Sequence, residues 1–123
     1  MANAGIGWID LTVDGAGSLK DFYATVTGLE AEAVSMGDYD DYVLRVPGGD
    51  PAAGICNRRG GNADIPSGWM IYFNVPDVDA AVLAATEAGG ELLKGPTGGE
   101  SYGRMAFIKD PAGNHFALFQ AGG

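Results

Sequence analysis

Several features that mark common protein classes are scarce in this chain of 123 residues. Its single cysteine, Cys56, excludes an internal disulfide and a metal cage built from cysteines. Seven Lys and Arg residues against 16 Asp and Glu residues give a net charge of −9, which disfavours binding to nucleic acids or anionic membranes. No apolar run approaches membrane-spanning length, and residues 1–5 lack the features of a signal peptide. We therefore expect a cytoplasmic protein whose residues 1–123 form one domain.

The second half of the chain repeats the pattern of the first. At an offset of about 62 positions, residues 8–13 align with 70–75, and each run leads into a helical pattern that ends at glycine. The repeat predicts two copies of one small unit, about 5–60 and about 67–121, and neither copy is large enough to close a core alone. A ligand site is therefore expected in a cup where the two copies meet.

The first copy is typical of a strand, a helix and three further strands. Alternating apolar residues in 7–13 predict a strand with one apolar face. Ser18, with Asp21 three residues later, predicts the N-cap of a helix that ends at Gly28. The apolar stripe of this helix consists of Leu19, Phe22, Tyr23 and Val26. Strands are expected near 30–34, 42–46 and 52–57, and the Gly-rich stretch 58–68 is expected to link the copies.

The second copy has the same order of elements. A strand over 69–75 precedes a helix that Asp77 is expected to cap, and the stripe of this helix consists of Val78, Ala81, Val82 and Ala85. Strands are expected near 91–93, 105–109 and 115–120, with a type I turn at 110–113. Each half thus predicts β-α-β-β-β, an α+β fold. A ferredoxin-like sandwich is disfavoured, because it has too few strands between its helices for a chain with room for about four.

Four sequence features together resemble those of a known superfamily. They are the two βαβββ units, Phe22-Tyr23 on the first helix, Gly28-Leu29 after it, and residues 110–114 before the last strand. In this order they resemble the vicinal oxygen chelate superfamily of glyoxalase I, bleomycin and fosfomycin resistance proteins and extradiol dioxygenases. Residues 69–72, Trp-Met-Ile-Tyr after the linker, resemble especially its short bacterial glyoxalase-like members. The resemblance implies two modules that form a pair of cupped half-barrels, a cavity that holds a divalent metal in enzymatic members, and a homodimer.

The resemblance also implies metal-ligand positions, and none of them carries a suitable side chain. The positions are Trp8 and Met70 on the first strand of each copy, with Gly54 and Ala117 on the last strands. None can hold Zn, Ni, Mn or Fe, so the family metal centre is expected to be absent. Asp10 and His115 together would supply only two ligands for a displaced ion, fewer than the usual three.

Alternation along the strands selects the side chains expected to line the cup. The predicted ligand-binding residues are Trp8, Thr12, Cys56, Met70, Asn74, Tyr102 and Phe119. They form an apolar wall with few polar groups, as is usual for a small-molecule pocket. Tyr102 lies in the Gly-rich run 98–103, a candidate lid. The alternative for an aromatic residue such as Trp8 is the plain core, and for Cys56 an inert buried thiol.

Asp10, Tyr72 and His115 are the candidate catalytic residues. Histidine is the side chain whose unperturbed titration falls near neutrality, so His115 could exchange a proton with Asp10 within hydrogen-bond reach. The alternatives are a half-exposed His115 at the end of its strand and a structural hydrogen bond from Asp10 to Tyr72, Thr12 or the backbone.

Three functions are compatible with these residues. The first is a metal-free protein that binds a small, partly aromatic ligand in the cup. The second is a lyase or isomerase in which Asp10, Tyr72 and His115 carry out acid–base chemistry, with or without an unconventional metal. The third is a dimeric interaction module without a small ligand. We rank them in this order. The ranking depends on the residues of the predicted site, because a fold by itself does not carry a function.

Overall fold

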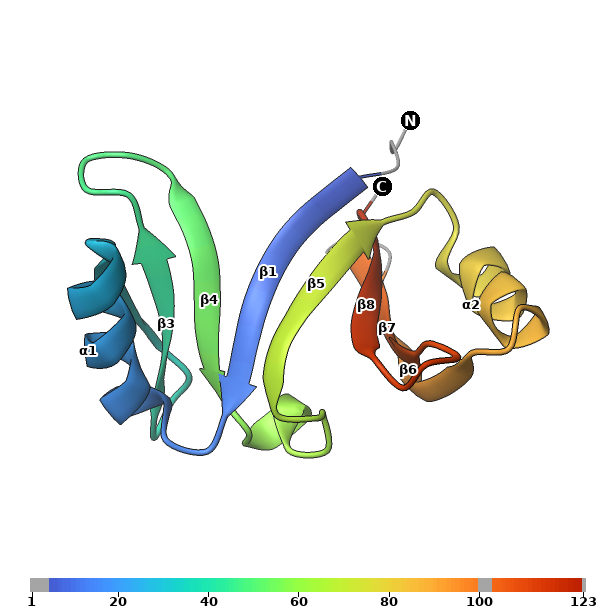
Figure 1. Cartoon of the computed structure of the whole chain (residues 1–123), viewed down its shortest axis with the longest axis horizontal. Helices are drawn as coiled ribbons and strands as arrows, with labels where there is room; N and C mark the ends of the chain where they lie inside the picture. Colours follow the sequence, from blue (N-terminus) through green and yellow to red (C-terminus); the bar gives the residue numbers. More distant parts are fainter. Residues whose placement is uncertain (1–4, 100–102, 123) are drawn as a thin grey trace. The chain divides into compact units, whose positions relative to one another are not determined.

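The computed structural model describes residues 5–99 and 103–122, and its elements follow the predicted order (Figure 1). The first half has β1 (Gly5–Val13), α1 (Ala16–Thr27), β2 (Glu30–Ser35), β3 (Asp40–Arg45) and β4 (Pro51–Asn57), followed by a short 3-10 helix (Gly60–Asn62). The second half has β5 (Gly68–Asn74), α2 (Val78–Glu87), β6 (Glu91–Gly99), β7 (Gly103–Lys109) and β8 (His115–Gln120). The α+β fold with two βαβββ modules is confirmed. Within these described residues, neither α1 nor α2 is long and apolar enough to cross a membrane.

The chain divides into two compact units, and the division falls inside β1. One unit is Ile9–Trp69, and the other combines the residues up to Trp8 with those from Met70 onward. Gly5–Trp8 therefore belong with the second half of the chain, which the repeat in the sequence does not indicate. The predicted module bounds and the predicted cup between the copies stay predictions.

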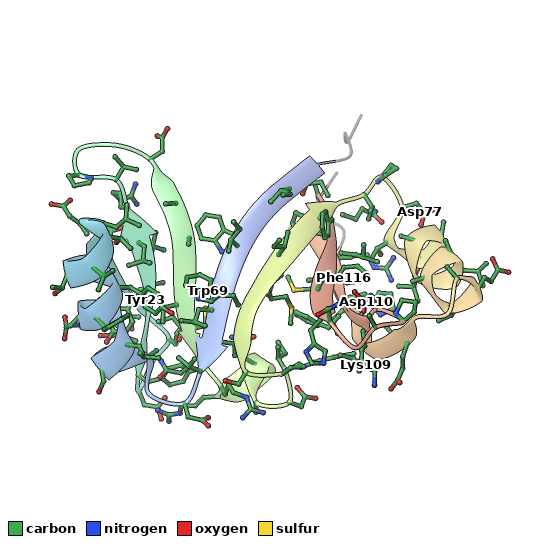
Figure 2. The ribbon with its side chains drawn as sticks, viewed as in Figure 1. Tyr23, Trp69, Asp77, Lys109, Asp110 and Phe116 are labelled. Atoms are coloured by element: carbon green, nitrogen blue, oxygen red, sulfur yellow. The ribbon has the colours of Figure 1, made fainter. Side chains whose placement is uncertain are left out.

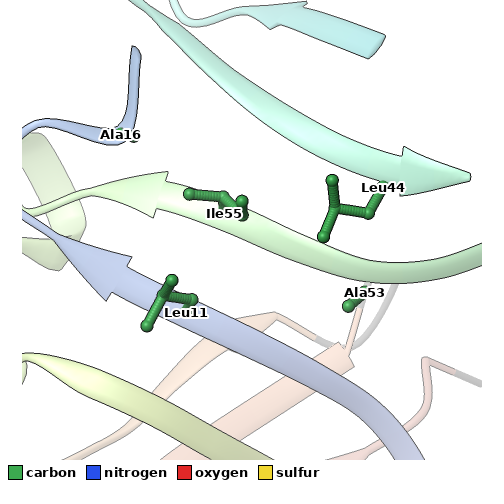
Figure 3. Packing of buried hydrophobic residues seen from close by; sticks show 5 residues of the cluster. All are labelled: Leu11, Ala16, Leu44, Ala53 and Ile55. Carbon is green, nitrogen blue, oxygen red and sulfur yellow. The ribbon is translucent and has the colours of Figure 1, made fainter. Parts of the chain in front are cut away.

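The 9–69 unit has four strands in the order β2-β3-β4-β1, with α1 on one face. β1 runs parallel to β4, with Asp10 opposite Gly54, and the other pairs are antiparallel. The buried core of this unit consists of Leu11, Ala16, Leu44, Ala53 and Ile55 (Figure 3). The apolar alternation of β1 thus directs Leu11 toward α1, as predicted.

The second unit repeats this pairing with the order β5-β8-β7-β6. β5 runs parallel to β8, with Tyr72 opposite Ala117, which matches the pairing of Asp10 with Gly54 in the 9–69 unit. The repeat found in the sequence is therefore also a repeat of strand register.

The predicted helix signals in the second half are confirmed. Val78, Ala81, Val82 and Ala85 pack from α2 onto Ala106, Ile108 and Leu118 of the sheet. Asp77 lies at the start of α2 (Figure 2), and its carboxylate accepts a hydrogen bond from the Ala80 amide at 3.2 Å. The turn between β7 and β8 is closed by a hydrogen bond from the Gly113 amide to the Asp110 carbonyl at 3.0 Å.

The predicted start of α1 is wrong. The helix begins at Ala16, preceded by Gly15 in a left-handed conformation (φ 115°), and no side chain caps it. Ser18 lies within the first turn, where its amide donates to the Gly15 carbonyl. The buried side of the helix also differs from the predicted stripe. Ala16 packs in the core with Leu19 and Tyr23, while Phe22 and Val26 are 57% and 65% exposed.

The strand predicted near 91–93 is longer in the structure, where β6 spans Glu91–Gly99. Its pairing with β7 changes register between Leu92 and Lys94 and again between Lys94 and Thr97. Such irregularities break the alternation of side chains between faces. The periodic signal of the strand is therefore lost after its first residues.

Candidate functional site

A pocket of about 350 Å³ lies within the unit that contains Met70 and the residues after it. The described residues that line it are Gly7, Trp8, Tyr72, Asn74, Met105 and Phe119. They come from β1, β5, β7 and β8. The volume is near the lower end of the range for small-molecule sites, roughly 300–1,000 Å³.

The strand register brings the lining side chains together. Asn74 is opposite Phe119 in the parallel pair, and Phe119 is opposite Met105 in the antiparallel pair. Tyr72 lies two residues before Asn74 and therefore on the same face of β5. Its ring contacts Phe107 edge-on at a centroid distance of 6.0 Å, and Phe107 is itself buried. The aromatic wall of the pocket thus rests on a packed residue of the core.

Two glycines allow pocket side chains to lie directly against the backbone. An added Cβ at Gly103 would lie 2.6 Å from Cζ of Phe119, and one at Gly7 would lie 2.9 Å from Cγ of Asn74. Both distances are shorter than carbon atoms tolerate, so any larger residue would displace these side chains. Gly103 also has a positive φ of 104°, a conformation that favours glycine.

Four of the predicted site residues line this pocket, namely Trp8, Tyr72, Asn74 and Phe119. Met70 lies on β5, as Tyr72 and Asn74 do, but it is buried. Tyr102 lies outside the described residues. The sequence prediction did not include Met105 and Gly7. Alternation within the predicted strand 105–109 contained a signal for Met105, whereas nothing in the sequence distinguishes Gly7 from the other glycines.

Asp10, Thr12 and Cys56 lie in the other unit, where both Asp10 and Thr12 are buried. The Cys56 thiol is within hydrogen-bond reach of the carboxylates of Asp10 and Asp41. Asp41 is also buried, and it accepts hydrogen bonds from the Asn57 backbone amide at 2.9 Å and from the Asn57 side chain at 3.0 Å. Asp10 thus has a structural partner, Cys56, that the sequence did not indicate.

Burial raises the pKa of the Cys56 thiol well above its ordinary value, and the negative charges of Asp10 and Asp41 raise it further. Both effects disfavour the thiolate, which is the reactive form of cysteine. The thiol therefore stays protonated at neutral pH and is a poor nucleophile and metal ligand.

We expect iodoacetamide to alkylate Cys56 at pH 8.5 at least about tenfold more slowly in the folded protein than in urea, because the raised pKa removes thiolate. The rate in the folded protein should still rise about tenfold per pH unit near pH 10, where the rate in the unfolded chain has already reached its plateau. A pH–rate profile followed by mass spectrometry measures this, and Asp10→Asn should speed the reaction by removing one charge. Equal rates in the folded and unfolded protein would contradict the assignment.

His115 is exposed at the start of β8 and is not among the described residues that line the pocket. It precedes Phe119 by four positions on the strand, which corresponds to about 13 Å at roughly 3.3 Å per residue. The backbone of His115 therefore lies well away from that of Phe119, the residue of β8 that lines the pocket. Of the three candidate catalytic residues, the pocket contains only Tyr72.

The side chains at the implied metal-ligand positions do not suit a divalent metal. The implied ligand positions carry Trp8, Gly54, Met70 and Ala117, and no group of three His, Cys, Asp or Glu residues within 5–99 and 103–122 is arranged to hold an ion. Divalent metals in proteins require converging nitrogen, oxygen or thiolate donors.

Comparison with known families matches residues 5–118 to the model of the Glyoxalase/Bleomycin resistance protein/Dioxygenase superfamily. The chain belongs to this superfamily. It is 32% identical over 115 residues to the anthracycline biosynthesis protein DnrV of Streptomyces peucetius, covering 94% of this chain and 41% of that protein. It is also 32% identical over 114 residues to the putative glyoxylase CFP32 of Mycobacterium tuberculosis, covering 92% and 42%. The chain thus spans about two fifths of the length of these superfamily relatives.

Solved structures show the same fold. A variant of Streptomyces coelicolor methylmalonyl-CoA epimerase in complex with 2-nitronate-propionyl-CoA has a TM-score of 0.61 at 18% identity, covering 96% of this chain and 97% of that one. A hypothetical protein from Bacillus halodurans has a TM-score of 0.62 at 14% identity, covering 98% and 96%. At these identities the likeness shows the glyoxalase-like fold alone.

Proposed function

We propose that this superfamily member binds a small, partly aromatic molecule and does so without the metal centre of its enzymatic relatives. The observation that carries the proposal is the pocket of about 350 Å³ lined by Trp8, Tyr72 and Phe119. Aromatic rings bury a large apolar area and stack on planar ligands. An apolar pocket with a few polar groups is the usual form of a small-molecule site.

Two further observations support the proposal, one on the metal and one on the ligand. The side chains at the implied metal positions cannot coordinate a divalent ion, and within the described residues no group of three His, Cys, Asp or Glu is placed to do so. One of its relatives at 32% identity is an anthracycline biosynthesis protein, and anthracyclines contain fused planar rings. The likeness covers only part of that relative, so its role in the pathway does not transfer.

Metal analysis and a ligand titration test the proposal together. After incubation with Ni²⁺, Zn²⁺, Mn²⁺ or Fe²⁺ and desalting, we expect a metal-to-chain ratio near zero by mass spectrometry. In ¹⁵N-labelled protein, uncharged aromatic compounds should shift the amide signals of Trp8, Tyr72 and Phe119. A stoichiometric ion that disappears on Asp10→Asn or His115→Gln would overturn the proposal and favour an enzyme.

The second candidate is a lyase or isomerase of the same superfamily. Structures of epimerases share its fold, and one relative is named a putative glyoxylase. In this alternative Asp10, Tyr72 and His115 would transfer protons. It ranks second because His115 is exposed and does not line the described pocket.

The third candidate is a dimeric interaction module without a small ligand. Phe22 and Val26 on α1 expose large apolar surfaces, as such a module would require. A homodimer also remains compatible with ligand binding, and light scattering coupled to size-exclusion chromatography would measure it. We also propose a cytoplasmic location.

A further inference from the structure

We propose that Asn74 makes the pocket selective for uncharged aromatic ligands that carry a carbonyl or hydroxyl group at the ring edge, and that Gly7 positions its amide for this contact. The inference rests on the proposed function of the pocket and goes further, because it names the ligand chemistry and the residue that recognises it.

The Asn74 amide is available to a ligand. Asn74 is half-buried at the end of β5 and lines the pocket, and within 5–99 and 103–122 no residue hydrogen-bonds to its side chain. An amide supplies two N–H donors and one carbonyl acceptor. An amide in an otherwise apolar wall raises the affinity for a ligand that forms a hydrogen bond with it. It lowers the affinity for a ligand that shields the amide from water without forming that bond.

Gly7 restricts where this amide can lie. An added Cβ at Gly7 would lie 2.9 Å from both Cγ and Nδ2 of Asn74 and closer still to Oδ1. The amide therefore rests against the backbone of β1, beside Trp8 on the same strand. Trp8 and Asn74 line the same pocket, so a ligand ring held against Trp8 is expected to lie within reach of the amide.

The remaining lining determines the class of ligand. Trp8, Tyr72, Met105 and Phe119 offer apolar and aromatic surface, and the described lining contains no charged side chain. An anionic ligand would find no cationic partner here and would meet the net charge of −9 of the whole chain. The pocket therefore fits an uncharged aromatic ketone, quinone or phenol better than a carboxylate or a phosphate ester.

The test uses indane and 1-indanone, which share a bicyclic skeleton and differ in one carbonyl group. Titrations of the ¹⁵N-labelled full chain, followed by NMR, give both dissociation constants. The wild type should bind 1-indanone about 2- to 10-fold more tightly, as expected for one hydrogen bond between neutral groups. 1-Indanone should shift the Asn74 side-chain amide signals further than indane does, and indane-5-carboxylate should bind more weakly than indane.

Asn74→Leu keeps an apolar wall of similar size and should remove the preference for 1-indanone while indane still binds. If both compounds bind the wild type and the preference is absent, or survives Asn74→Leu, the inference about Asn74 is overturned while the proposed aromatic pocket stands. If neither compound binds, the proposed pocket function fails, and the inference fails with it.

Gly7→Ala tests the positioning role of Gly7. The methyl group should displace the Asn74 amide, so the preference should fall as in Asn74→Leu while indane binding is retained. Gly17→Ala is the matched control, because Gly17 lies exposed on α1 and an added Cβ there would meet only Tyr42 Oη at 3.6 Å. An unchanged preference and unchanged Asn74 side-chain signals in Gly7→Ala would overturn the assignment of Gly7.

Discussion

Replacing Trp8 with alanine is expected to weaken binding of 1-indanone by about 10- to 100-fold, the largest effect that we predict for any pocket residue. The indole ring lines the pocket, and removing it takes away apolar contact worth roughly 1.5–3 kcal/mol. Isothermal titration calorimetry is the appropriate measurement, because it does not depend on the fluorescence of the residue that is removed.

His115→Gln provides the matched comparison in the same unit. His115 is exposed and does not line the described pocket, so its replacement should leave the dissociation constant unchanged within error. The opposite result, loss of binding in His115→Gln with little change in Trp8→Ala, would place the ligand elsewhere. A turnover that His115→Gln abolishes while binding persists would support the lyase or isomerase alternative.

Replacing Ile55 with alanine is expected to lower the free energy of unfolding by about 2–5 kcal/mol. Ile55 is fully buried on β4 (Figure 3). It pairs with Leu11 on β1 and with Tyr42 on β3. Its removal leaves a cavity between the sheet and α1. Because small domains are stable by only about 5–15 kcal/mol, the variant should unfold at a clearly lower urea concentration.

Ile55→Val is the control, because it removes one methylene group and should lower the free energy of unfolding by only about 0.5–1.5 kcal/mol. Urea titrations followed by circular dichroism compare the two variants with the wild type. A loss below about 1 kcal/mol in Ile55→Ala would mean that the core of the 9–69 unit is less tightly packed than the burial of Ile55 indicates.

The sequence predicted the elements of the fold well wherever side chains repeat with a regular period. The stripe of α2 and the cap at Asp77 were correct, because both signals are local and unambiguous. The start of α1 was wrong, because Ser18 and Asp21 imitate a capping box, whereas the conformation of Gly15 has no signature beyond its being a glycine. The length of β6 was missed because its irregular register breaks the alternation of side chains.

The candidate site was predicted only in part, because alternation assigns a strand face but not a position along the strand. It placed Phe119 and His115 on the same face of β8, yet only Phe119 lines the described pocket. The close approach of the Asn74 side chain to the backbone at Gly7 involves two strands far apart in the sequence, so no local pattern encodes it. The environment of Cys56 likewise requires Asp10 and Asp41 from two other strands.

The division of the chain within β1 has a practical consequence for protein engineering. Gly7 and Trp8 lie at the start of the first copy of the repeat, yet they belong to the compact unit that begins again at Met70. Cutting the coding sequence at the linker between the repeats would therefore separate Trp8 from Tyr72 and leave each fragment with an incomplete binding wall. A split-protein reporter or a graft of the second repeat would need these first residues supplied in trans or joined to the new N-terminus.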